Sequence, residues 1–207
     1  MKKEATSPRR RGRPPSFERE AVLKKAMLTF WALGYEGASI ADLTAAMGIT
    51  AQSLYAAFGS KSALYREALH HYQHTVGAYT ALALQQEPTA LEAFKRILTE
   101  SATEFCRSRR PRGCMVSTSS LACAVENQEE VRHVAQLREA TIGAFRERID
   151  RAIAQGEFKP ETDSTALARY LGAIVQGMAI QARDGATRAQ LQQVAALAIT
   201  TLQQFST

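Results

Sequence analysis

Residues 34–65 read GYEGASIADLTAAMGITAQSLYAAFGSKSALY, and this stretch decides the fold. Glycines that often end helices are interleaved with small polar residues that often begin them: Ser39, Gly48, Thr50, Gly59 and Ser60. Between them, apolar side chains recur at helical spacing, as at Ile40, Leu43 and Met47. The stretch therefore predicts two short helices joined by a tight glycine turn and followed by a longer helix.

Helical periodicity continues outside this stretch, from Phe17 to the end of the chain, without the alternating runs that are typical of strands. We expect an all-α fold with about nine helices. Their expected ranges are 17–33, 39–47, 50–58, 61–86, 88–108, 114–124, 127–155, 164–183 and 189–205. A bend is expected at Gly77, and Asn127 with Glu130 forms a capping pattern at a helix start.

Residues 1–16 hold six basic side chains against Glu4 alone, while the whole chain has a formal charge of +6. Most of the net charge therefore belongs to this segment and not to the rest of the chain. The segment also contains almost nothing apolar to bury. We expect a disordered basic arm that attracts polyanions such as nucleic acid.

Composition excludes several classes of protein. No apolar run reaches the roughly 18 residues of a membrane span, and no apolar segment follows the basic N-terminus as in a secretory signal. We therefore expect a cytoplasmic protein. The three cysteines lack metal-ligand spacing: Cys106, Cys114 and Cys123. A histidine cluster (His70, His71, His74) is interpreted as a solvated helix face, so we expect neither a metal site nor a cofactor.

The last two expected helices have the composition of an interface. No charged residue follows Arg188, although a terminal helix on a surface would normally carry lysine and glutamate. Gly172 and Gly177 keep positions of the preceding helix small, which allows close approach of helices. We expect a homodimer that pairs these helices in a four-helix interface. The alternative is a deeply buried core helix within one chain.

The stretch from Gly34 to Leu64 resembles the DNA-binding head of the tetracycline-repressor (TetR) family. The resemblance rests on these positions: Gly34, Tyr35, Gly37, Ser39, Ile40, Leu43, Gly48, Ile49, Thr50, Leu54, Tyr55, Phe58, Lys61 and Leu64. Beyond the first third of the chain, agreement is limited to length and helical character. The resemblance implies a helix-turn-helix domain at 17–66 that binds double-stranded DNA, and an effector-binding and dimerisation domain at 67–207.

A helix as short as 50–58 fits the DNA major groove, where side chains read base edges. Leu54 and Phe58 are expected to face the head, which leaves an uncharged outer side: Thr50, Ala51, Gln52, Ser53 and Ala56. The amide of Gln52 is expected to pair with adenine. Three further side chains are expected to contact the phosphate backbone: Ser39, Tyr55 and Lys61. The alternative is a packed helical corner without groove contact.

The arm contains Arg11, Gly12, Arg13 and Pro14, which resemble the core of an AT-hook. In that motif two arginines enter an A·T-rich minor groove. A solvated basic tail with nonspecific attraction to DNA is an equal alternative. Because the reading helix has no charged side chain, we expect the arm to supply part of the affinity.

The resemblance implies a pocket for an unknown small effector in the helical body. Large apolar side chains are candidates for its lining, although plain core is their commoner role: Phe94, Leu98, Phe105, Met115, Phe145, Ile149, Tyr170, Ile174 and Met178. Cys114 lies at an expected helix start after several arginines (Arg107, Arg109, Arg110, Arg112), and both features stabilise a thiolate. It is therefore a candidate sensor thiol, with a small buried hydrophobe as the commoner alternative.

Together these features predict a homodimeric, ligand-responsive transcriptional repressor and not an enzyme. Its two heads would occupy successive major grooves of a near-palindrome, about 34 Å apart or a small multiple of that. One rival is an architectural protein of A·T-rich DNA that needs no effector. A second rival is an enzyme that uses Cys114 with His133, which lacks an oriented third partner and any cofactor fingerprint.

Overall fold

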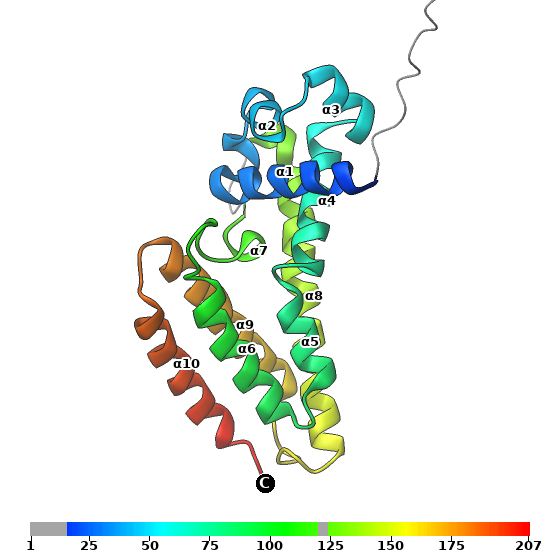
Figure 1. The fold of residues 1–207 in the computed structure, drawn as a ribbon. Coiled ribbons are helices and arrows are strands. Elements are labelled where there is room, and N and C mark those ends of the chain that lie inside the picture. Colours follow the sequence, from blue (N-terminus) through cyan, green and yellow to red (C-terminus); the bar gives the residue numbers. More distant parts are fainter. Residues whose placement is uncertain (1–15, 120–123) are drawn as a thin grey trace, which may run out of the picture.

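The computed structural model describes residues 16–119 and 124–207, and the all-α fold expected from the sequence is confirmed there. The elements are α1 (Ser16–Gly37), α2 (Ile40–Met47), α3 (Ala51–Phe58), α4 (Lys61–His74), α5 (Ala78–Gln86), α6 (Ala90–Glu104), α7 (Met115–Thr118), the 3-10 turn η1 (Val125–Asn127), α8 (Gln128–Ala154), α9 (Ser164–Arg183) and α10 (Arg188–Gln203). Figure 1 shows α1 to α3 as a small head above an elongated helical body. Across the described ranges, no helix combines the length and apolar composition of a membrane span.

The head is built on one apolar core. α1 packs on α4 and α2, and α3 contacts both α2 and α4. Phe30 and Trp31 of α1 meet Tyr65 and Tyr72 of α4, with ring centroids 4.9 and 5.0 Å apart, respectively. Leu54 of α3 is fully buried in the same core. The apolar stripes of these helices therefore decide how the two short helices sit on α1 and α4.

The body has a second core, which includes the edge-to-face pair of Phe94 and Phe145. α10 packs on α6 and α9, while α8 packs along α9. α8 also extends from the head to the far end of the body (Figure 1). The short α7 lies between the two cores. Its Met115 and Val116 belong to the head core, whereas the preceding Cys114 packs against both.

The helix expected over 61–86 is divided into α4 and α5, and the expected bend at Gly77 is the point of division. Thr75 leaves the helical region of backbone dihedrals, with φ −122° and ψ −89°. A Cβ at position 77 would lie 3.1 Å from Cε1 of Tyr72, so the chain turns closely around that ring. The division places α5 beside α6 and exposes one side of Tyr72 to the cavity described below.

The segment around α7 differs from the sequence prediction. The helix expected over 114–124 ends at Thr118, and residues 120–123 lie outside the described ranges. The capping pattern predicted at Asn127 and Glu130 is wrong, because the side chain of Asn127 makes no cap hydrogen bond. Asn127 Nδ2 instead donates to Glu36 at 2.7 Å, and Glu130 faces α4. Both side chains therefore form hydrogen bonds with the head in place of the local helix cap.

Gly113 determines how closely the loop before α7 passes α9. Its φ is +80°, and an added Cβ would lie only 2.5 Å from the carbonyl oxygen of Ala179. Both the positive φ and the close backbone approach favour glycine. This contact holds Cys114 at the boundary between head and body.

Candidate functional site

The two short helices of the head are capped as the sequence predicts. The backbone N–H of Ser39 donates to the carboxylate of Asp42 at 3.0 Å, and the N–H of Asp42 donates to Ser39 Oγ at 3.1 Å. The hydroxyl of Ser39 also donates to that carboxylate, at 2.5 Å. This hydrogen bond, followed by the one from the backbone N–H of Ser39, lowers the pKa of Asp42. Gly48 ends α2 with φ +72°, a conformation that favours glycine. The turn between α2 and α3 is thus set by local chemistry.

α3 has one buried face and one exposed face, as predicted. Leu54 and Phe58 lie in the head core. Thr50 caps the helix by accepting a hydrogen bond from the N–H of Ser53 at 3.1 Å. The predicted outer residues are all exposed: Thr50, Ala51, Gln52, Ser53 and Ala56. The ring of Tyr55 is 48% exposed beside them. The head therefore presents a narrow, uncharged helix edge to its surroundings.

The other predicted DNA contacts flank this edge. Ser39 is exposed at the start of α2. Lys61 is half-buried at the start of α4, and its Nζ lies 4.5 Å from the centroid of the Tyr35 ring, as in a cation–π contact. The predicted arm residues Arg11 and Arg13 lie outside the described residues. The structure thus brings Ser39, Lys61 and α3 together in one head.

Sequence reasoning missed Arg19 of α1. Its guanidinium lies 4.6 Å from the centroid of the Phe58 ring and pairs with Glu67 of α4 at 2.8 Å. Arg19 therefore ties α1 to the end of α3 and to α4. The sequence offered no signal for it, because the partners are far apart along the chain. Thr44 and Ala45 were also missed, and they line a shallow groove between α2 and α3.

The body contains a cavity of about 570 Å³, bordered by α4, α5, α7, α8 and α9. Of the nine predicted lining residues, Phe105 and Phe145 line it. The others belong to the cores or pack against them: Phe94, Leu98, Met115, Ile149, Tyr170, Ile174 and Met178. The cavity volume is within the range of small-molecule sites.

Two tyrosines and a cysteine are among the residues that line the cavity. Burial raises the pKa of Tyr79, whose hydroxyl lies 2.9 Å from Ser101 Oγ. Burial also raises the pKa of Tyr72, with nearby Cys114 as the next cause. Both phenols therefore remain neutral. Cys114 is half-buried, lines the cavity and accepts a weak hydrogen bond from the N–H of Ser117 at 3.5 Å.

One of the arginines predicted to lie near Cys114 contacts Cys106 instead, the other cysteine of the described ranges. Arg112 Nη2 lies 3.4 Å from the sulfur of Cys106. Arg107 and Arg110 pair with Glu104. Within the described ranges, no hydrogen bond joins one of these arginines to Cys114. Cys114 therefore lines the cavity, whereas Cys106 is the described cysteine that contacts an arginine.

The comparisons with known proteins agree with this architecture. The family model "Bacterial regulatory proteins, tetR family" matches residues 22–68. The HTH-type transcriptional repressor ComR of Escherichia coli (strain K12) is 36% identical over 191 residues, which cover 89% of each chain. The chain belongs to the TetR family. It is accordingly a DNA-binding transcriptional regulator.

Solved structures of TetR-family regulators have the same fold. A cysteine mutant of the regulator CifR, in complex with a 26-base-pair operator duplex, is 40% identical with a TM-score of 0.87. The match covers 91% of this chain and 98% of that chain. A TetR regulator from Chloroflexus aurantiacus is 25% identical with a TM-score of 0.75, covering 92% and 96% of the two chains.

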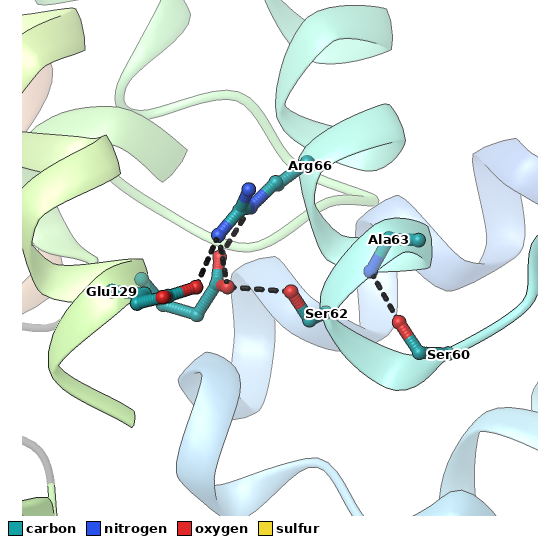
Figure 2. A network of polar contacts seen from close by, with 6 residues as sticks. Ser60, Ser62, Ala63, Arg66 and Glu129 are labelled. Carbon is teal, nitrogen blue, oxygen red and sulfur yellow. Dashed lines mark hydrogen bonds and ion pairs between the residues drawn. The ribbon is translucent and has the colours of Figure 1, made fainter. Parts of the chain in front are cut away.

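In this TetR-family regulator, polar contacts between described residues join the head to the body at several places, of which the hydrogen bond from Asn127 to Glu36 was given above and two more follow. Figure 2 shows the first, where Ser62 and Arg66 of α4 meet carboxylates at the start of α8. Ser62 Oγ donates to Glu130 at 2.6 Å, and Arg66 Nη2 donates to the same carboxylate at 2.9 Å. At the second, Arg183 of α9 donates to the carbonyl oxygen of Ala32 at 2.8 Å. These hydrogen bonds connect the body directly to α1 and α4.

Proposed function

We propose that this regulator is a repressor that binds a near-palindromic operator as a homodimer and is released by a small molecule in the body cavity. The observation that carries the proposal is the exposed, uncharged edge of α3, which Leu54 and Phe58 hold on the head core. Such an edge is narrow enough for the major groove and can read bases without charge. ComR, the related protein from Escherichia coli, is described as a repressor.

The side chains predicted to face outward at α3, together with three flanking residues, have these roles in the proposal. Gln52 pairs with adenine through its amide, and Ala51 and Ala56 contact thymine methyl groups. Thr50 and Ser53 are short hydroxyl groups near the helix start. Ser39, Tyr55 and Lys61 bind phosphates on either side and set the register of the head. The arm, including Arg11 and Arg13, adds affinity at the adjacent minor groove.

The domain organisation follows from the same assignment. Residues 17–66 form the DNA-binding domain, and residues 67–207 bind the effector and dimerise. The dimer interface consists of α9 and α10, where Ile180 and Leu197 are 42% and 72% exposed. No charged side chain follows Arg188 on α10, and an uncharged face with exposed apolar residues suits a symmetric contact.

Effector release is supported by the position of the cavity. α4 begins beside the reading helix and ends at Tyr72, Gln73 and His74, which line the cavity. A ligand that moves this end of α4 would change the orientation of the heads. Such a ligand must prefer the DNA-incompetent conformation by about 1–3 kcal/mol to act as an inducer.

The proposal is tested with the DNA that precedes the regulator's own gene. Footprinting should show two protected half-sites whose centres are about 34 Å apart or a small multiple of that. A palindromic duplex should bind far more tightly than a random A·T-rich duplex of equal length. Equal binding to both would instead support an architectural DNA protein without an effector.

A second candidate function is favoured by the placement of Cys114 in the cavity wall. A half-buried thiol at this position could sense electrophiles, and its modification would occupy the cavity. Alkylation with iodoacetamide should then weaken operator binding by the wild-type protein and by Cys106→Ser. Cys114→Ser should resist the treatment. Loss of binding by Cys114→Ser as well would eliminate this function.

A further inference from the structure

The lining of the body cavity combines apolar surface with a single fixed charge. Apolar side chains such as Val116, Leu137 and Val175 supply most of the wall. Among the described residues, the lining contains no aspartate or glutamate, and its one arginine or lysine is Arg138 of α8. The other ionisable side chains of the lining are His74, Cys114 and two tyrosines, Tyr72 and Tyr79, which burial keeps neutral. The cavity therefore has a positive electrostatic character at one point of an apolar surface.

Arg138 retains donors for a ligand. Its Nη1 donates to the carbonyl oxygens of Val116 and Ser119 at 3.3 and 3.4 Å, which are long contacts. No ion pair involves Arg138 within the described ranges, and Nε and Nη2 make no hydrogen bond there. The next residue, Glu139, pairs with Arg169 at 2.7 Å. Residues 120–123 lie outside the described ranges, and their sequence contains no aspartate or glutamate.

A half-buried guanidinium without a carboxylate partner favours an anion, and its planar fork matches the two oxygens of a carboxylate. The apolar wall favours a ligand that is otherwise hydrophobic. A monoanion suits a single cation, because a doubly charged phosphate ester would lose more hydration in the same surroundings. These three conditions together describe one class of compound.

We infer that the cavity binds a hydrophobic carboxylate, with the carboxylate on Arg138 and the apolar part along α5, α8 and α9. This inference rests on the proposed function, in which the cavity is the effector site. The same arginine also links the ligand site to the head. Arg138 holds Val116 of α7, and Val116 packs in the head core. A bound carboxylate competes for that guanidinium and loosens α7 from α8.

The test compares 2-naphthoate with the neutral 2-naphthamide, which has nearly the same shape. Trp31, the only tryptophan, lies 5.0 Å from the cavity residue Tyr72 and reports binding by fluorescence, with calorimetry as a second readout. Wild-type protein should bind the acid at least about tenfold more tightly than the amide. Arg138→Gln should lose this preference but keep its affinity for the amide. The exposed Arg132→Gln, on the same helix, should retain it.

Equal affinity of the wild-type protein for acid and amide, or binding of neither, would overturn the inference without any variant. So would an Arg138→Gln protein that still prefers the acid. Operator binding without ligand is measured separately, and it tests the proposed function as a DNA-binding repressor. Arg138-dependent binding of the acid with no effect on operator affinity would support the ligand class and contradict effector release.

Discussion

Arg66 of α4 and Glu130 of α8 form an ion pair at 2.9 Å that joins the DNA-binding head to the body. The side chain of Glu130 is only 4% exposed, whereas that of Arg66 is 42% exposed. Ser62 donates a further hydrogen bond to the same carboxylate. Hydrogen bonding and then the charge of Glu130 raise the pKa of Arg66. A buried carboxylate thus depends on two side chains of α4, Ser62 and Arg66, for its hydrogen bonds.

Arg66→Ala should destabilise the protein by about 2 kcal/mol, because a buried carboxylate loses its charged donor. Urea unfolding followed by circular dichroism measures this change. The matched control is Arg169→Ala, which removes an ion pair whose two side chains are 57% and 58% exposed. That control should cost no more than about 0.5 kcal/mol. A similar loss in both variants would show that the Glu130 pair has no special role.

Gln52→Ala should remove discrimination at one base pair of each half-site. A bidentate amide–adenine pair contributes about 1–3 kcal/mol of selectivity against the wrong base. The check is a set of operator duplexes with single base-pair changes, measured by fluorescence anisotropy. Gln136→Ala, at an exposed position of α8, is the control and should leave the profile unchanged. Uniform weakening over all duplexes would rule out direct reading by Gln52.

Removal of residues 1–15 should flatten the salt dependence of operator binding. The slope of log affinity against log salt should decrease by about 0.9 for every phosphate contact that is lost. Deletion leaves α1 intact, because this helix begins at Ser16. An unchanged slope would exclude the arm from DNA binding.

A narrower change distinguishes the two interpretations of the arm. The double variant Arg11→Ala/Arg13→Ala should lose preference for A·T-rich flanks if these arginines enter the minor groove. If the arm is only a solvated basic tail, the same variant should bind A·T-rich and G·C-rich flanks with equally reduced affinity.

The head could be predicted from the sequence because its signals are local. Ser39, Gly48 and Thr50 act within one turn of their own positions, and the spacing of apolar residues chooses the buried face of α3. The Arg66–Glu130 pair could not be found in this way, because its partners are 64 residues apart. Glu130 also matched a capping pattern, and tertiary contacts replaced that pattern.

The cavity shows a different limit of sequence reasoning. Large apolar residues were chosen as its lining, but such residues fill space and mark the core. The wall is made in part by small residues, including Gly77, Ala78, Ala140 and Ala144. A cavity forms where side-chain volume is missing, and that depends on which helices face each other. The pattern along one helix does not contain this information.

The proposed dimer interface can be tested at its most exposed apolar residue. On α10, the side chains of Leu191, Ala195 and Leu202 are buried in the body, whereas Leu197 is 72% exposed. Leu197→Lys would place like charges near each other across a two-fold axis and would desolvate them. Sedimentation equilibrium should therefore show a monomer at concentrations where the wild-type protein is a dimer, and operator affinity should fall with it. Leu33→Lys, at a 49% exposed position on α1, should remain dimeric. A dimeric Leu197→Lys protein would show that the dimer contact lies elsewhere. A monomeric wild-type protein would show that the proposed dimer does not form.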